Sequence, residues 1–172
     1  MSTTPKGIAP DLGGKVVVAR YGRDLEDFTV GDVYEHRPGR TVTQADNIHF
    51  SLLTMNRHPV HCDDAYSANA EFGQALVNST LTLAIVTGLT VDDVSARAIA
   101  NLGWRDVKLT APVFVDDTLY ARTKVLDARG SKSRPGKGVV TTYTEGYKQD
   151  GTVVLSFERV SLVRKRGHGP EA

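Results

Sequence analysis

The chain has 172 residues, 40% of them hydrophobic, which is enough for one well-formed core and too few for two, so we expect one domain. Twenty-one Lys and Arg residues against twenty Asp and Glu leave a net charge of +1, which argues against a nucleic-acid-binding protein and favours a small-molecule partner. The single cysteine, Cys62, excludes an intrachain disulfide and a cysteine-based zinc cage.

The two ends of the chain show no pattern of regular structure. Residues 1–22 are rich in Gly, Pro and Thr, and we expect a flexible arm there. This arm has no apolar run of the secretory kind, so the default expectation is a cytoplasmic protein. Residues 167–172 form a short tail, and residues 23–166 are expected to form the single domain. We expect no membrane association.

The first regular elements are a strand and a short helix. Residues 27–43 alternate at Val33, Glu35 and Arg37 and are interrupted by Pro and Gly, which predicts a strand with a break. Residues 43–54 predict a short helix, because Thr43 and Asp46 have the spacing of a capping box. This helix leads into a polar loop that begins at residue 56.

Residues 76–89 predict a helix that is apolar on every side, with only small Ser and Thr residues between its apolar positions. A helix of this kind is normally buried. Its fourteen or so residues are fewer than the ~20 that span a bilayer, so it should form the core of the domain. Asn78 and Ser79 are favoured N-caps, and Gly88 marks the end of the helix.

Four β-rich segments follow this helix, each bounded by a turn signal. Asp150-Gly151 is the strongest hairpin signal among them. Short connections favour an antiparallel sheet, and the first strand brings the number of strands to five or more. We therefore predict an α+β domain in which the sheet wraps around one long buried helix. The four segments are residues 96–109, 118–129, 138–149 and 152–164.

The polar loop ahead of the helix gathers candidates for chemistry. His61 is the best general acid or base, because an imidazole titrates near pH ~6.5. Equally open is the interpretation that His58 and His61 only make backbone hydrogen bonds. A metal site formed by His58, His61 and Asp63 is less favoured, because their spacing matches no helical zinc motif. Cys62 has no evident partner as a nucleophile. The polar residues of the loop are Asn56, His58, His61, Asp63 and Asp64.

The start of the helix, Asn78-Ser79-Thr80, is the second candidate feature. Its unpaired backbone N–H groups can stabilise an oxyanion that develops on a substrate carbonyl. The alternative is simple capping. A base beside an oxyanion site is a recurring arrangement for chemistry α or β to a carbonyl, so the two features together indicate more than either alone.

These residues resemble the MaoC-like hotdog dehydratases, which include the (R)-specific enoyl-CoA hydratases. The family motif reads roughly Asp-x-Asn-Pro-x-His, then Phe-Gly, then His-Gly-Met at the start of the central helix. The matching runs here are residues 56–61, 72–73 and 77–81. The resemblance implies a hotdog fold, an acyl-CoA substrate with no separate cofactor, and a homodimer or higher homo-oligomer. It places the catalytic His on His61 and the oxyanion-binding amide on Ser79.

Several positions depart from the family motif, and the most important is Asn56, an amide where the motif has the catalytic Asp. An amide does not move protons near neutral pH, so either His61 carries both proton transfers while Asn56 holds the water, or a carboxylate such as Asp63 contributes. This variant of the motif resembles that of the subgroup that acts on branched dicarboxylic thioesters such as mesaconyl-CoA or itaconyl-CoA. The departures are Asn56 for the catalytic Asp, His58 for Asn, and Asn78-Ser79 for His-Gly.

The expected activity is hydration of a 2-enoyl-CoA thioester, with Asn56, His61 and Ser79 as the catalytic residues and no metal. A hotdog thioesterase is a rival, disfavoured because residues 76–89 carry no carboxylate. A non-catalytic acyl-thioester-binding protein is the second rival, which Asn56 keeps open. Basic residues at 124–137 and 164–166 either hold the CoA phosphates or are simply solvated. The residues expected to touch the substrate are Asn78, Arg57, His58 and Asp63, with Arg57 as the cation for a second carboxylate.

Overall fold

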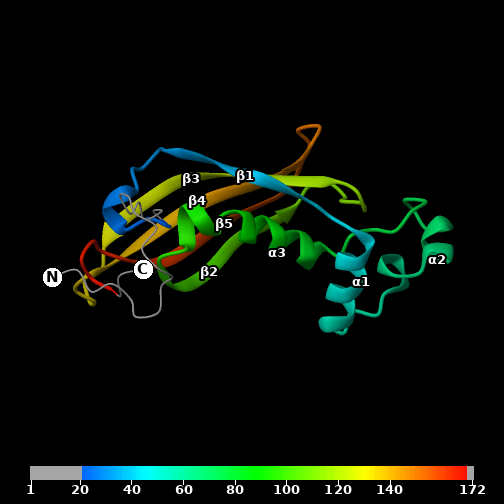
Figure 1. Ribbon diagram of the computed structural model, residues 1–172, viewed down its shortest axis with the longest axis horizontal. Coiled ribbons are helices and arrows are strands. Elements are labelled where there is room, and N and C mark those ends of the chain that lie inside the picture. The colour runs from blue at the N-terminus through cyan, green and yellow to red at the C-terminus, as the bar shows by residue number, and fades with distance from the viewer. Residues whose placement is uncertain (1–20, 170–172) are drawn as a thin grey trace, which may run out of the picture.

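The computed structural model describes residues 21–169, so most of the predicted N-terminal arm and residues 170–172 of the predicted tail lie outside the described range. Within that range, one antiparallel sheet of five strands lies against helices on one side (Figure 1). No helix in this part of the chain is long and apolar enough to cross a membrane. The strands are β1 (Val33–Thr41), β2 (Ala98–Leu109), β3 (Thr118–Gly130), β4 (Lys137–Lys148) and β5 (Val153–Arg164).

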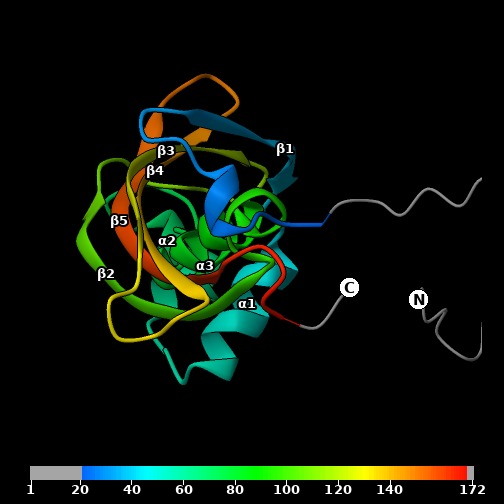
Figure 2. The same ribbon diagram turned by 90° about the vertical axis from the view of Figure 1, so that its left-hand side faces the viewer.

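The sheet has the strand order β1-β3-β4-β5-β2, so that β1 and β2 form its two edges. Side chains along β3 and β4 alternate between buried and more exposed positions, as expected of strands with one face on the core. Viewed end-on, the sheet curls around helix α3 (Ser79–Leu89) (Figure 2). The α+β arrangement predicted from the sequence is therefore confirmed.

The segment between β1 and α3 forms helices that project beyond one end of the sheet (Figure 1). Helix α1 (Gln44–Leu53) begins with the predicted capping box: Asp46 N–H donates to Thr43 Oγ1 at 3.2 Å, and Thr43 N–H donates to Asp46 Oδ2 at 2.9 Å. A 3-10 turn (Pro59–His61) and helix α2 (Asp64–Ala68) follow, where the sequence indicated only a loop. These short elements fix the polar residues in one conformation.

Helix α3 differs from its prediction in length and in burial. It begins three residues later, because the chain before it is extended: Val77 N–H donates to Val113 C=O at 2.9 Å, and Leu76 forms an isolated bridge with Phe114. The prediction that this helix is buried on every side was wrong, since Thr80, Ala84 and Gly88 are exposed. The sheet covers one side of the helix, and the small residues face away from it.

The buried side of α3 packs closely on the centre of the sheet. Val86 is fully buried and lies directly over Gly146 of β4, where a Cβ atom would collide with the valine side chain. Glycine at this position therefore lets the helix approach the strand. Leu81, Val86 and the inward side chains of β3 and β5 form the main core cluster. This core fixes the direction of α3 and hence the position of its first turn.

A buried histidine lies beyond the other end of α3. His36 of β1 has no exposed surface; its Nδ1 lies 2.9 Å from Asp93 Oδ2 and its Nε2 lies 2.8 Å from Thr123 Oγ1. Burial lowers the pKa of His36 below its ordinary value, and the hydrogen bond to Asp93 offsets part of that effect. The other charges that act on this ring or its partner are Glu35, Arg159 and Arg23, of which Arg23 lies 3.5 Å from Asp93.

We predict that the free energy of unfolding falls as the pH drops below about 6.5, where His36 of the unfolded chain takes up a proton that the folded chain does not. The loss continues until the lowered pKa of the folded state is reached, and one proton contributes at most about 1.4 kcal/mol per pH unit. Urea unfolding at several pH values measures the slope of the free energy of unfolding against pH. In His36→Gln the slope should shrink, whereas in His49→Gln, which changes an exposed histidine, it should not. Equal slopes in the two variants would contradict this account.

Candidate active site

His61 is placed by a tight turn whose sequence explains its geometry. Pro59 occupies the first position of the 3-10 turn, and the His58 side chain caps it by accepting the Val60 N–H at 3.2 Å on Nδ1. His61 is therefore held at the end of a rigid turn and is only 8% exposed. A buried imidazole needs a hydrogen-bond partner for at least one ring nitrogen.

The partner of His61 fixes its tautomer. Its Nδ1 lies 2.8 Å from the carbonyl oxygen of Leu76. A carbonyl oxygen can only accept, so Nδ1 carries the hydrogen and the neutral ring presents a lone pair on Nε2. No other group among residues 21–169 hydrogen bonds to Nε2. The ring is therefore arranged as a base whose reactive nitrogen is available.

Asn56 lies next to this turn and is half-buried. Its Oδ1 accepts the His58 N–H at 3.1 Å, while Nδ2 has no acceptor in the described part of the chain. The free N–H groups can hold the oxygen of a water molecule. The His58 ring lies 6.0 Å from the His61 ring, so the structure brings these three predicted residues together.

The start of α3 provides both capping and an unused N–H group. Asn78 is the N-cap, and its Oδ1 accepts the Thr80 N–H at 3.0 Å and the Thr80 hydroxyl at 2.7 Å. In contrast, no acceptor for the Ser79 N–H lies within the described range. It points out of the positive end of an eleven-residue helix, where negative charge is favoured. Capping therefore leaves the Ser79 N–H available to another acceptor.

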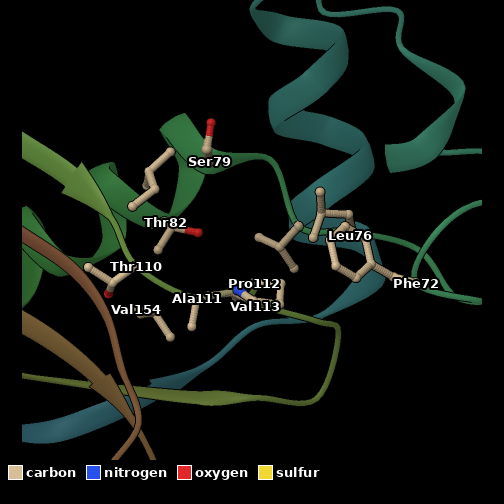
Figure 3. A pocket seen from close by; sticks show the side chains of 11 residues that line it. Phe72, Leu76, Ser79, Thr82, Thr110, Ala111, Pro112, Val113 and Val154 are labelled. Atoms are coloured by element: carbon tan, nitrogen blue, oxygen red, sulfur yellow. The ribbon is translucent and has the colours of Figure 1, made fainter.

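A pocket of about 340 Å³ lies beside the helix start (Figure 3). Phe72 and Leu76 lie on one side of it, and Thr82 and Val154 lie on the other. His61 does not line the pocket, but Leu76, whose carbonyl holds the His61 ring, does. The lining is apolar apart from three hydroxyl groups, which suits an uncharged acyl chain. It consists of Phe72, Leu76, Val77, Ser79, Thr82, Leu109, Thr110, Ala111, Pro112, Val113 and Val154.

The remaining loop residues lie outside this arrangement. Asp63 caps α2 by accepting the Tyr66 N–H at 2.9 Å, which accounts for its position, and its contact with substrate stays a prediction. Arg57 is exposed and forms no ion pair with another described residue. Cys62 is exposed. Among residues 21–169, no group of three or more His, Cys, Asp and Glu side chains could hold a metal ion.

The β3–β4 connection and the end of β5, which carry most of the basic residues considered for the CoA phosphates, lie at the far end of the sheet from α1 and α2 (Figure 1). Two of them are engaged elsewhere, since Arg129 pairs with Asp127 and Arg166 pairs with Asp27. Within one subunit, these residues are therefore remote from His61.

Sequence reasoning missed Asn47, which lies on α1 and is completely buried. Its amide hydrogen bonds to the main chain of His61, Leu76 and Asn78. The available signal was a pair of polar residues four apart, Asn47 and Ser51, on the inner side of α1, where a helix packed on a core normally carries apolar residues.

Comparisons with known proteins by sequence point to one family. The family model described as "MaoC like domain" matches residues 26–147. The chain is 34% identical over 145 residues to a mesaconyl-CoA hydratase of Cereibacter sphaeroides, with 84% of this chain and 42% of the relative covered. It is 36% identical over 146 residues to a β-methylmalyl-CoA dehydratase of Chloroflexus aurantiacus, with 84% and 41% covered. The chain thus spans about two fifths of the length of these relatives.

Solved structures agree with this assignment. The crystal structure of a putative MaoC domain protein dehydratase from Chloroflexus aurantiacus superposes with a TM-score of 0.80 at 34% identity, with 88% of this chain and 43% of that chain covered. The hotdog fold expected from the resemblance is confirmed, since a further neighbour with a TM-score of 0.78 is described as having a double hotdog fold.

Proposed function

Because the chain belongs to the MaoC-like domain family, we propose that it is a hydro-lyase that adds water across the double bond of a 2-enoyl-CoA thioester. One observation carries the proposal: the neutral His61 ring is held by the carbonyl of Leu76, two residues before the capped start of α3, whose Ser79 N–H is unused. The base, on its own turn, is thereby tied through Leu76 to the short segment that carries the oxyanion donor.

In the proposed reaction, His61 Nε2 takes a proton from water while the water oxygen bonds to the β carbon. The π electrons move towards the thioester carbonyl, and the Ser79 N–H stabilises the negative charge on its oxygen. The imidazolium then returns its proton to the α carbon, so that His61 alone carries both transfers. Asn56 Nδ2 orients the water. No separate cofactor takes part, since CoA belongs to the substrate.

The substrate class is proposed in finer detail from the names of the relatives. The pocket contains no charged side chain, so a second carboxylate, as in mesaconyl-CoA, has to bind outside it. We propose that Arg57, exposed and without an ion pair in the described range, binds that carboxylate. His58, Asn78 and Asp63 complete the proposed substrate-contacting set.

We also propose that a second copy of the chain covers the open edge at β2. Five large apolar side chains of this edge strand are exposed: Ile99, Leu102, Trp104, Val107 and Leu109. An edge strand with unpaired backbone groups and apolar side chains favours pairing with another strand. Leu109 also lines the pocket, so a homodimer would complete its wall.

A panel of enoyl-CoA thioesters tests the activity itself. Hydration removes the absorbance of the conjugated thioester without release of free CoA, whereas a thioesterase releases free CoA. α3 carries no carboxylate between Ser79 and Leu89, which favours hydration over hydrolysis. Binding without either reaction would identify a non-catalytic acyl-thioester-binding protein.

We expect His61→Ala to lower kcat by ~10²-fold or more, the usual contribution of a general acid or base. Steady-state kinetics on the best thioester of the panel measures the effect. His49→Ala, which removes an exposed histidine of α1, serves as the control and should keep wild-type turnover. A folded His61→Ala protein with near-normal kcat would exclude His61 from the mechanism.

Asn56→Asp should lower kcat/KM by about tenfold or more, equivalent to ~1.4 kcal/mol in the barrier. The carboxylate would keep the bond to the His58 N–H but place a negative charge beside His61 and repel a substrate carboxylate. The comparison runs on a dicarboxylic and a simple enoyl-CoA thioester. If kcat/KM on the simple thioester rises well above wild type, the chain is better described as a decayed ordinary hydratase.

Light scattering at micromolar concentration should give the mass of a dimer. Trp104→Lys places a charge in the exposed apolar edge and should shift the protein towards monomer. Leu53→Lys changes an 81% exposed leucine of α1, away from β2, and should leave the dimer intact. A stable wild-type monomer would refute the proposed assembly.

A further inference from the structure

Asn47 connects three segments that meet at the candidate active site. One Nδ2 hydrogen is donated to the His61 carbonyl at 2.9 Å and the other to the Leu76 carbonyl at 3.1 Å. Its Oδ1 accepts the Asn78 N–H at 2.9 Å. The residue is completely buried, so these three hydrogen bonds are formed in the absence of bulk water.

Only a carboxamide fits this set of partners. The two carbonyls require two N–H donors, and the Asn78 N–H requires an acceptor, which also fixes the orientation of the amide. Aspartate has no hydrogen to donate when ionised, and leucine can neither donate nor accept. Loss of these bonds would leave buried main-chain polar groups without partners.

The Leu76 carbonyl is the point where Asn47 and His61 meet. It accepts the Asn47 Nδ2–H at 3.1 Å and the His61 Nδ1–H at 2.8 Å. The direction of this carbonyl therefore decides which ring nitrogen of His61 carries the hydrogen. Through the Asn78 N–H, the same amide also fixes the residue directly before Ser79.

We propose that Asn47 is a positioning residue that sets the tautomer of His61 and the spacing between His61 Nε2 and the Ser79 N–H. The catalytic consequence rests on the proposed hydratase function, whereas the effect on the tautomer does not. Asn47 makes no contact with the proposed substrate; it acts through the orientation of the base and the oxyanion donor.

Two variants test this role. Asn47→Leu has a similar volume and removes all three hydrogen bonds; we expect kcat to fall about 10- to 100-fold with KM changed less than about threefold. Asn47→Asp keeps the acceptor for the Asn78 N–H, removes the donors and adds a charge. It should lower kcat similarly and move the acidic limb of the kcat/KM profile to higher pH. If Asn47→Leu does not fold, Asn47→Asp alone tests the positioning role of Asn47.

Nitrogen-15 NMR of the histidine side chains provides a readout independent of turnover. In the wild type with a neutral His61 ring, the hydrogen should reside on Nδ1. Both Asn47 variants should show a substantial Nε2–H population, and the His61 signals are assigned by their absence in His61→Gln. Asp46→Ala is the control, since it weakens the cap of α1 without touching these bonds, and it should keep both the tautomer and kcat.

The inference is overturned if either folded Asn47 variant keeps the Nδ1–H tautomer, or keeps kcat within threefold of wild type. It is also overturned if Asp46→Ala loses kcat to the same extent at matched thermal stability, because the loss would then reflect a weakened α1. A wild-type protein inactive on every thioester would refute the proposed function, and the tautomer measurement would still decide the role of Asn47.

Discussion

The hydrogen bond from His61 Nδ1 to the Leu76 carbonyl is the interaction on which the candidate site depends. It selects the neutral tautomer with Nε2 available, and it joins the turn that carries the base to the segment that enters α3. An imidazole without this bond could present either nitrogen. Proton transfer at a fixed position requires one tautomer in one orientation, and the main chain supplies both.

The fold holds this carbonyl from several directions. Residues 76 and 77 are extended and pair with residues 113 and 114, so the chain enters α3 along the edge of the pocket. The Asn78 cap ends this extended stretch, and the packing of Val86 over Gly146 fixes the axis of the helix. The geometry of the first turn is thus set by main-chain pairing before it, capping at its start and core packing behind it.

The sequence predicted the elements of this arrangement better than the contacts between them. Alternation and turn signals located the strands, and the spacing of Thr43 and Asp46 located α1, because these signals are local. The start of α3 was misplaced, because Leu76 and Val77 fit a helical pattern equally well and pair with a segment more than thirty residues away. The role of Asn47 was invisible for the same reason, since its three partners lie 14 to 31 residues further along the chain.

The side chains that hold His61 and the first turn of α3 are uncharged: Asn47 and Asn78 are amides and Ser51 is a hydroxyl. Amides and hydroxyls orient their partners but do not exchange protons near neutral pH. Asn56 is also an amide, so the imidazole of His61 is the group among these residues that can accept and donate a proton. In the proposed reaction these uncharged groups do not repel an anionic substrate, and the Ser79 N–H is left to stabilise the negative charge on the thioester oxygen. In the proposed hydratase, an amide at residue 56 would therefore suit a site that works with one base and binds a second carboxylate nearby.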